Sequence, residues 1–287
     1  MPPKSITTLQ ADGERHEVRS ESLVWRDEKR ARDVPVKIWR SDLAAPAPVV
    51  IVSHGIGEDR DSYEYLGRAL AAAGFYAVHI THAGTDRAVL EKGYRHLYRA
   101  VKQRENWVNR TFDVSFILDQ LERDERADVE RAAVVGHSAG AFTAFSVAGL
   151  RVAGEERTLR DRRVKVIVPM SMPRLDGVVP AGGYDLVAIP VLNITGTCDA
   201  SLIYRTLPRH RRVPFESTHA SGHWLVTIAG VNHDSFSATE ARQHDLIARL
   251  TISFLRAHLL GDGEARSWFE DAGHVELNGT GMTVERK

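Results

Sequence analysis

Short runs of β-branched and other apolar residues recur along the chain, and segments with helical periodicity separate them. A run that is apolar at every position predicts a strand buried on both faces of a sheet. Buried strands that alternate with amphipathic helices predict an α/β fold with a mostly parallel central sheet and helices on both faces. Such sheets place ligands and chemistry at the carboxyl ends of their strands. The apolar runs lie at residues 49–52, 75–80, 132–135, 164–168, 187–194 and 224–228.

Three intervening segments repeat apolar residues at the i, i+3, i+4 and i+7 spacing of a helix that buries one face. The first of them ends at Gly74, a residue type that commonly stops a helix. Ahead of the first buried run, alternating apolar and polar residues predict two short strands. We expect the helices at 65–73, 114–121 and 246–255, and the two strands at 23–26 and 34–39.

The composition suits one α/β domain spanning residues 1–287, whose polar first 20 residues are expected to be peripheral. Lys plus Arg and Asp plus Glu both number 38, so charge gives no reason to expect nucleic acid as a partner. The single cysteine, Cys198, excludes an internal disulfide and suits a reducing compartment. No apolar signal segment is visible near Met1, so we expect a cytoplasmic protein. The apolar runs are also too short to span a membrane, and the oligomeric state is left open.

The strongest chemical signal follows the apolar run at 132–135. Residues 136–140 read Gly-His-Ser-Ala-Gly, which matches G-x-S-x-G, and an amphipathic segment continues to residue 150. Strand, sharp turn and helix form the context in which this motif presents a nucleophilic serine. The glycines are needed because the strained turn admits no bulky neighbours. We therefore predict that Ser138 is a nucleophile; a chance Gly/Ser turn is the alternative.

A serine hydroxyl is a weak nucleophile and needs a base. When the nucleophile lies on such a turn, an acid and then a histidine follow it along the chain. Asp199 comes directly after the run at 187–194, and His233 comes after the run at 224–228. Both residues therefore lie at the edge of the sheet where Ser138 is expected. We predict Asp199 as the acid and His233 as the base.

Other residues compete for the same two roles. Asp176 follows the run at 164–168 and is the main alternative acid. Asp234 adjoins His233, but its side chain would have to fold back on its own backbone. The alternative histidines are in less suitable places, because they precede a strand or fall on the last helix. They are His219, His223, His244 and His258.

Acyl transfer also needs two backbone N–H groups directed at the oxygen that becomes negative. One is expected from Ala139, which follows the nucleophile, and the other from Ile56 in the loop after the run at 49–52. That loop reads His-Gly-Ile-Gly at residues 54–57, and its glycines allow the backbone to turn its N–H groups inward. Neither nucleotide-binding glycine motif occurs, and no H-E-x-x-H or paired cysteines are present, so we predict no cofactor and no metal.

These motifs resemble the α/β-hydrolase superfamily, and the resemblance covers roughly residues 30–260. More narrowly, the chain is similar to bacterial hydrolases related to dienelactone hydrolase or to platelet-activating-factor acetylhydrolase. It departs from the first by having Ser138 where those enzymes use cysteine, and from the second because the strand at 164–168 has no acid at its tip. The resemblance therefore implies ester hydrolysis without either named substrate. It rests on residues 53–57, 61–67, 82–86, 136–140, 195–199 and 230–236.

A basic segment at 86–110 follows a predicted strand end and should lie near the mouth of the site. It is interpreted either as a partial cap that attracts esters with an acidic end, or as a solvated basic helix. Its cations are Arg87, Lys92, Arg95, Arg99, Lys102, Arg104 and Arg110.

The sequence thus predicts a hydrolase that cleaves small carboxylic esters through an acyl-enzyme on Ser138. A thioesterase, peptidase or acyltransferase would use the same residues. From a different class, a catalytically inactive binding module on the same fold is the remaining alternative, because fold does not guarantee activity.

Overall fold

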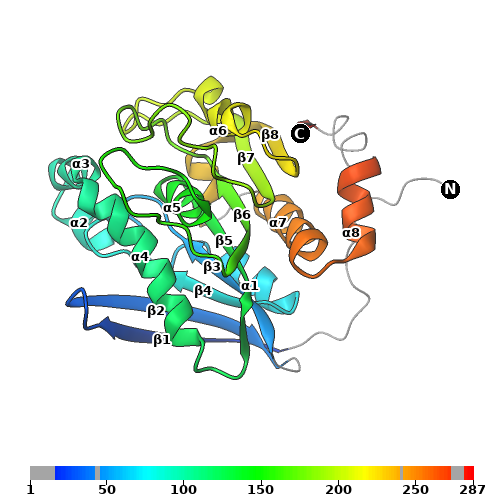
Figure 1. Cartoon of the computed structure of the whole chain (residues 1–287), viewed down its shortest axis with the longest axis horizontal. Coiled ribbons are helices and arrows are strands. Elements are labelled where there is room, and N and C mark those ends of the chain that lie inside the picture. Colours follow the sequence, from blue (N-terminus) through cyan, green and yellow to red (C-terminus); the bar gives the residue numbers. More distant parts are fainter. Residues whose placement is uncertain (1–16, 43–45, 240–241, 273–280) are drawn as a thin grey trace.

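In the computed structural model, which describes residues 17–42, 46–239, 242–272 and 281–287, nine described strands form one sheet. Their order is β1-β2-β4-β3-β5-β6-β7-β8-β9 (Figure 1). The six strands from β3 to β8 are parallel, whereas β1, β2 and β9 join the two edges in antiparallel pairs. The strands are β1 Val18–Asp27, β2 Arg32–Ser41, β3 Ala47–Ser53, β4 Tyr76–Ile80, β5 Ala127–His137, β6 Val164–Met170, β7 Val191–Cys198, β8 His223–Asn232 and β9 Met282–Arg286.

Helices cover both faces of this sheet. In Figure 1, α4 and α5 lie on one side and α7 and α8 on the other. No described helix is long and apolar enough to cross a membrane. The helices are α1 Glu64–Ala72, α2 Arg87–Glu91, α3 Tyr94–Lys102, α4 Arg104–Leu121, α5 Ala139–Ala148, α6 Val213–Ser217, α7 His244–Leu259 and α8 Gly263–Ser267. Short turns of other helix types are η2 Pro208–Arg212, η3 Asp234–Phe236 and η4 Trp268–Ala272.

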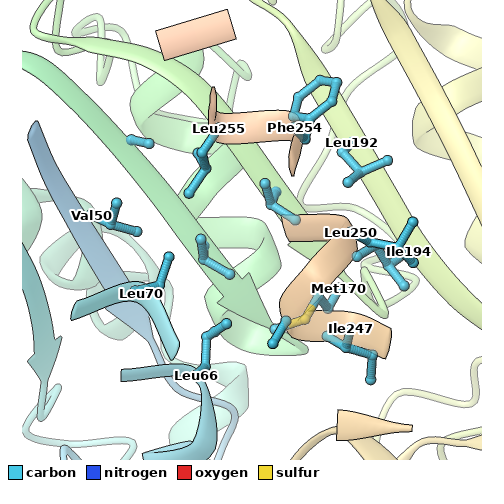
Figure 2. Packing of buried hydrophobic residues seen from close by; sticks show 14 of the residues in the cluster. Val50, Leu66, Leu70, Met170, Leu192, Ile194, Ile247, Leu250, Phe254 and Leu255 are labelled. Carbon is cyan, nitrogen blue, oxygen red and sulfur yellow. The ribbon is translucent and has the colours of Figure 1, made fainter. Parts of the chain in front are cut away.

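Two apolar clusters, one on each face, hold the layers together. Figure 2 shows the cluster in which α7 packs over the strands: Ile247 and Leu250 lie beside Met170 at the end of β6. Leu66 of α1 is fully buried in the same cluster. Burying one such side chain stabilises the fold by about 2 kcal/mol. The second cluster joins α4 and α5 to the opposite face of the strands.

The predicted fold class is confirmed, and its core strands are present with small shifts in their ends. The strand expected at 187–194 begins later, at Val191, because Pro190 precedes it. The edge strand β9 was not predicted, since its short sequence is anchored only by antiparallel pairing to β8. Residues 1–16 of the expected peripheral segment lie outside the described residues.

A larger correction concerns the helix expected at 114–121. This helix, α4, begins at Arg104, because two further turns bury apolar and aromatic side chains such as Trp107. The charged residues in those turns concealed the periodicity.

The strand order reverses direction at the centre of the sheet and so locates the site. From β3, the chain first goes to β4 on one side and then crosses to β5 on the other. The loops that leave β3 and β5 therefore separate and open a crevice at their carboxyl ends, the usual place for a ligand in an open α/β sheet.

Candidate functional site

Ser138 lies in a sharp turn between β5 and α5. Its φ and ψ of 55° and −115° are a strained combination for a residue with a side chain. Close packing around the turn requires both flanking glycines. A Cβ on Gly136 would lie 2.0 Å from the Gly140 carbonyl oxygen, and one on Gly140 would lie 1.9 Å from the Ser53 carbonyl oxygen. The motif therefore folds this way because only glycine fits on either side of Ser138.

Ser138, His233 and Asp199 come together at the carboxyl ends of three strands. Ser138 Oγ lies 3.1 Å from His233 Nε2. On the other side of the imidazole, Nδ1 lies 3.1 Å from Asp199 Oδ1. This order of contacts is the one in which an imidazole can take a proton from a serine while a carboxylate holds it.

Asp199 is completely buried, yet it carries a negative charge. Burial alone would raise its pKa, but the hydrogen bond with His233 and the nearby charge of Arg211 outweigh this and lower the pKa of Asp199 to about 2. Its oxygens also accept hydrogen bonds from Ser171 Oγ and Thr195 Oγ1, both at 2.8 Å. Asp199 is thus an ionised and fixed acceptor for the imidazole.

The loop after β3 contains Ile56, the second predicted oxyanion donor. His82 N–H donates to His54 Nε2 at 2.9 Å, so the proton of this neutral ring is on Nδ1 and donates to the Gly55 carbonyl at 2.5 Å. The Gly55 carbonyl and the Ile56 N–H belong to one trans peptide and point in opposite directions. This bond therefore fixes the direction of the Ile56 N–H. Within the described residues, neither the Ile56 nor the Ala139 amide donates a hydrogen bond.

Arg110 is a fully buried cation behind this loop. It donates to the carbonyl oxygen of His54, to Thr85 Oγ1 at 2.8 Å and to Thr143 Oγ1 at 3.0 Å. Burial lowers the pKa of Arg110 to about 10, so it remains charged at neutral pH. Arg110 thus joins the loop after β3, the loop after β4 and the first turns of α5. The loop after β3 contains the Ile56 amide, and α5 begins with the Ala139 amide, the two predicted oxyanion donors.

A second Ser–His–Asp arrangement lies beneath the first. His82 Nε2 is 2.9 Å from Ser53 Oγ, and His82 Nδ1 is 2.9 Å from Asp113 Oδ2. All three side chains are buried. Asp113 is also paired with Arg30 and Arg32. Burial, followed by the charge of Arg110, lowers the pKa of His82 to about 3. This set is an interior hydrogen-bond network that supports the loop after β3.

The alternative acid and bases do not join Ser138. Asp176 is on an exposed loop, where it pairs with Arg174 at 2.7 Å. His223 is buried at the start of β8, at the opposite end of the strand from His233. His244 stacks on Tyr65, and His258 packs against Phe254. His219 precedes β8, and Asp234 begins η3 directly after His233.

The basic segment at 86–110 folds as α2, α3 and the first turns of α4. Leu90 of α2 packs against Gly57, and Trp107 of α4 contacts the ring of Tyr204 near Ser138. The segment therefore flanks the site. Its cations are not equivalent, because Arg110 is buried whereas Arg95 and Arg99 are exposed on α3.

Three residues of the site were not predicted. Ser171 and Arg211 contact His233 Nδ1 at 2.7 and 3.0 Å. The buried hydroxyl of Tyr204 lies close to Ser138 and Arg110. Ser171 offered one signal, since it directly follows the predicted strand that has no acid at its end. Arg211 of η2 and Tyr204 of the preceding loop belong to no motif. Among the described residues, no group of three or more His, Cys, Asp or Glu is placed to hold a metal ion.

The comparisons with known proteins agree with the fold. A family model described as serine aminopeptidase, S33, matches residues 44–158, which is less than half of the chain. A search of curated proteins found no match. With its sheet, the strained turn at Ser138 and this match, the chain is an α/β-hydrolase, and more specifically a serine hydrolase of that fold. The match includes Ser138 and the loop with Ile56 but ends before Asp199 and His233, and it does not support the narrower resemblance to dienelactone-hydrolase-related or acetylhydrolase-like enzymes.

Proposed function

We propose that this chain hydrolyses carboxylic esters through an acyl-enzyme on Ser138. The observation that carries the proposal is the pair of 3.1 Å contacts that join Ser138 Oγ to His233 Nε2 and His233 Nδ1 to Asp199 Oδ1. The turn between β5 and α5 supports it further, because the strained backbone of Ser138 holds Oγ at the carboxyl end of the sheet beside His233 Nε2.

In the proposed reaction, Ser138 Oγ attacks the ester carbonyl carbon as His233 Nε2 takes its proton. The tetrahedral intermediate collapses when the bond to the alcohol oxygen breaks and the imidazolium returns the proton to that oxygen. Water then attacks the acyl-enzyme with His233 again acting as the base. Asp199 holds the imidazole and compensates its positive charge in both halves.

The negative oxygen of the intermediate would be stabilised by the N–H groups of Ile56 and Ala139. These amides need to be directed before the substrate arrives, since fixed dipoles require no reorganisation during the reaction. The hydrogen bond from His54 to the Gly55 carbonyl orients the first amide, and the start of α5 orients the second. The charge of Arg110, buried behind the loop, adds a favourable potential at the same place.

The matched family description also raises peptidase activity as a second candidate. An aminopeptidase must accept the positive amino end of a peptide. The buried guanidinium of Arg110, whose hydrogen-bond acceptors are all uncharged, lies next to the site and disfavours another cation there, whereas the charge of Arg211 is paired with Asp199. We therefore propose ester cleavage over aminopeptidase cleavage.

A parallel assay with p-nitrophenyl esters of increasing acyl length, acyl thioesters and aminoacyl p-nitroanilides tests this proposal. We expect the esters to give the highest kcat/KM, and Asp199→Asn to lower kcat by about 10⁴ by favouring the wrong imidazole tautomer. The matched control Asp176→Asn should retain wild-type rates. Preferred cleavage of the anilides or thioesters would replace the proposal with a peptidase or thioesterase, and no turnover of any substrate would favour the inactive binding module.

A further inference from the structure

Arg211 is a buried cation in direct contact with both His233 and Asp199. Its side chain is 0 % exposed. Nη2 lies 2.8 Å from Asp199 Oδ1 and 3.0 Å from His233 Nδ1. The usual serine-hydrolase mechanism requires only an acid at Nδ1. A positive charge at the same atom therefore needs its own explanation.

The remaining N–H groups of Arg211 fix its position. Nη1 donates to the carbonyl oxygens of Ser171 and Met172, both at 2.8 Å, and Nε donates to the Asp199 carbonyl at 3.2 Å. Four of the five guanidinium hydrogens thus have an oxygen acceptor, and the fifth is directed at His233 Nδ1. The guanidinium cannot turn away from His233 without losing these bonds.

The two neighbours of His233 Nδ1 favour different protonation states of the ring. Ser171 Oγ donates to Asp199 Oδ1, so its lone pair can accept a proton from Nδ1 at 2.7 Å. That state leaves Nε2 free to accept the Ser138 proton. Arg211 can only donate, so its N–H toward Nδ1 is satisfied only when Nδ1 carries no proton. The donor therefore disfavours both states that carry a proton on Nδ1, and the positive charge of Arg211 disfavours the doubly protonated imidazolium in particular, whereas the negative charge of Asp199 favours it.

We propose that Arg211 is a positioning residue that holds Asp199 ionised and in place while its charge disfavours the imidazolium of His233, which extends activity to lower pH. The inference rests on the proposed function, because it assigns Arg211 a role through His233 and Asp199. It goes beyond that function by naming the residue that sets the acid limit of the reaction.

Charged and titratable groups from several elements face His233. Asp199 approaches from the end of β7 and Arg211 from η2. From β5, His137 lies with its ring centroid 4.7 Å from that of His233. Burial lowers the pKa of His137 well below its usual range, so this neighbour is uncharged. Asp199 and Arg211 are therefore the two charged groups whose opposite effects on the protonation of His233 the experiment must separate.

The experiment compares Arg211→Gln with Arg211→Lys, which have similar size but differ in charge. The readout is the rate at which a fluorophosphonate labels Ser138 as a function of pH, because this rate reports the base without requiring a known substrate. A like charge within about 4–6 Å moves such a midpoint by about 1–3 pH units. We therefore expect the midpoint of Arg211→Gln to rise by at least about one unit, and that of Arg211→Lys to stay within about half a unit of wild type. Arg212→Gln, which removes an exposed cation from the same element, is the matched control and should not move the midpoint.

Equal midpoints in the Gln and Lys variants would overturn the inference, since a purely structural role moves both alike. If Arg211→Gln does not fold, Arg211→Met, which keeps the length of the side chain without its charge, carries the same comparison with Arg211→Lys. The midpoint of Arg211→Met should then be higher by at least about one unit, and equal midpoints would overturn the inference. Failure of wild-type Ser138 to label at any pH would overturn the proposed function as well, which distinguishes the two failures.

Discussion

Replacing Gly140 by alanine tests how closely the nucleophile turn must pack against the loop after β3. The new Cβ would lie 1.9 Å from the Ser53 carbonyl oxygen, and real Cβ atoms do not approach closer than 3.0 Å. The two segments must therefore separate by about 1.1 Å. Because Ala139 adjoins this point and Ile56 is in the displaced loop, the two amides proposed to bind the oxyanion would move apart. A misplacement of about 1 Å costs on the order of 100-fold in rate.

Helix propensity and close packing predict opposite changes in the free energy of unfolding for Gly140→Ala, so the sign of the change distinguishes them. Gly140 is in α5, where helix propensity alone would make alanine stabilising by about 1 kcal/mol. Overlap with backbone should reverse this and destabilise the protein by about 1–3 kcal/mol. The matched control is Gly263→Ala at the start of α8, where nothing lies within 4 Å of the added Cβ.

Esterase kinetics and thermal unfolding of both variants provide the assay. Gly140→Ala should lower kcat at least about 100-fold and lower Tm, whereas Gly263→Ala should retain both. Wild-type kcat with an unchanged or raised Tm in Gly140→Ala would refute the argument from close packing.

Two other predictions concern charge. Replacing the exposed cations Arg95, Arg99 and Lys102 by serine should raise KM for a negatively charged ester and leave KM for a neutral ester unchanged. The difference between the two esters should disappear at high salt, because salt screens exposed charges. Equal changes in KM for both esters would favour a helix that is only solvated. Burial raises the pKa of Asp113, but its bonds to His82 and the charge of Arg32 prevail and lower that pKa to about 2. The ionised Asp113 should therefore stabilise the fold fully above about pH 4, and this stabilisation should be lost as the pH falls toward 2. In urea unfolding, Asp113→Asn should lower the free energy of unfolding by about 2 kcal/mol or more at pH 7 and by less between about pH 4 and pH 2. A loss of free energy that is the same at every pH would contradict the prediction.

The alternation of apolar runs and helical periods was sufficient to predict the central strands, because buried parallel strands have few polar positions. Chain order and strand ends were sufficient to predict which residues meet Ser138. Asp199 and His233 each follow a strand directly, so the parallel sheet brings them to one edge. These inferences needed only local sequence and the topology that it implies.

Arg110 and Arg211 show what local sequence does not contain. Arg110 was grouped with the other cations of the 86–110 segment, because its acceptors on the loops after β3 and β4 and on α5 become neighbours only in the folded chain. Arg211 is in a basic stretch, 208–212, and its burial depends on carbonyl groups that follow β6. A buried cation needs hydrogen-bond acceptors from several segments, and the periodicity of the sequence does not predict which segments will supply them.

The identity of the nucleophile is the central claim, and mass mapping after reaction with a fluorophosphonate tests it most directly. Ser53 provides a demanding comparison, because its 2.9 Å contact with His82 resembles that of Ser138 with His233, although the His82 side chain is completely buried and that of His233 is 18 % exposed. We predict a single label on Ser138, within the tryptic peptide 132–151, that persists in Ser53→Ala and disappears in Ser138→Ala. A label on Ser53, or labelling that survives in Ser138→Ala, would contradict the account.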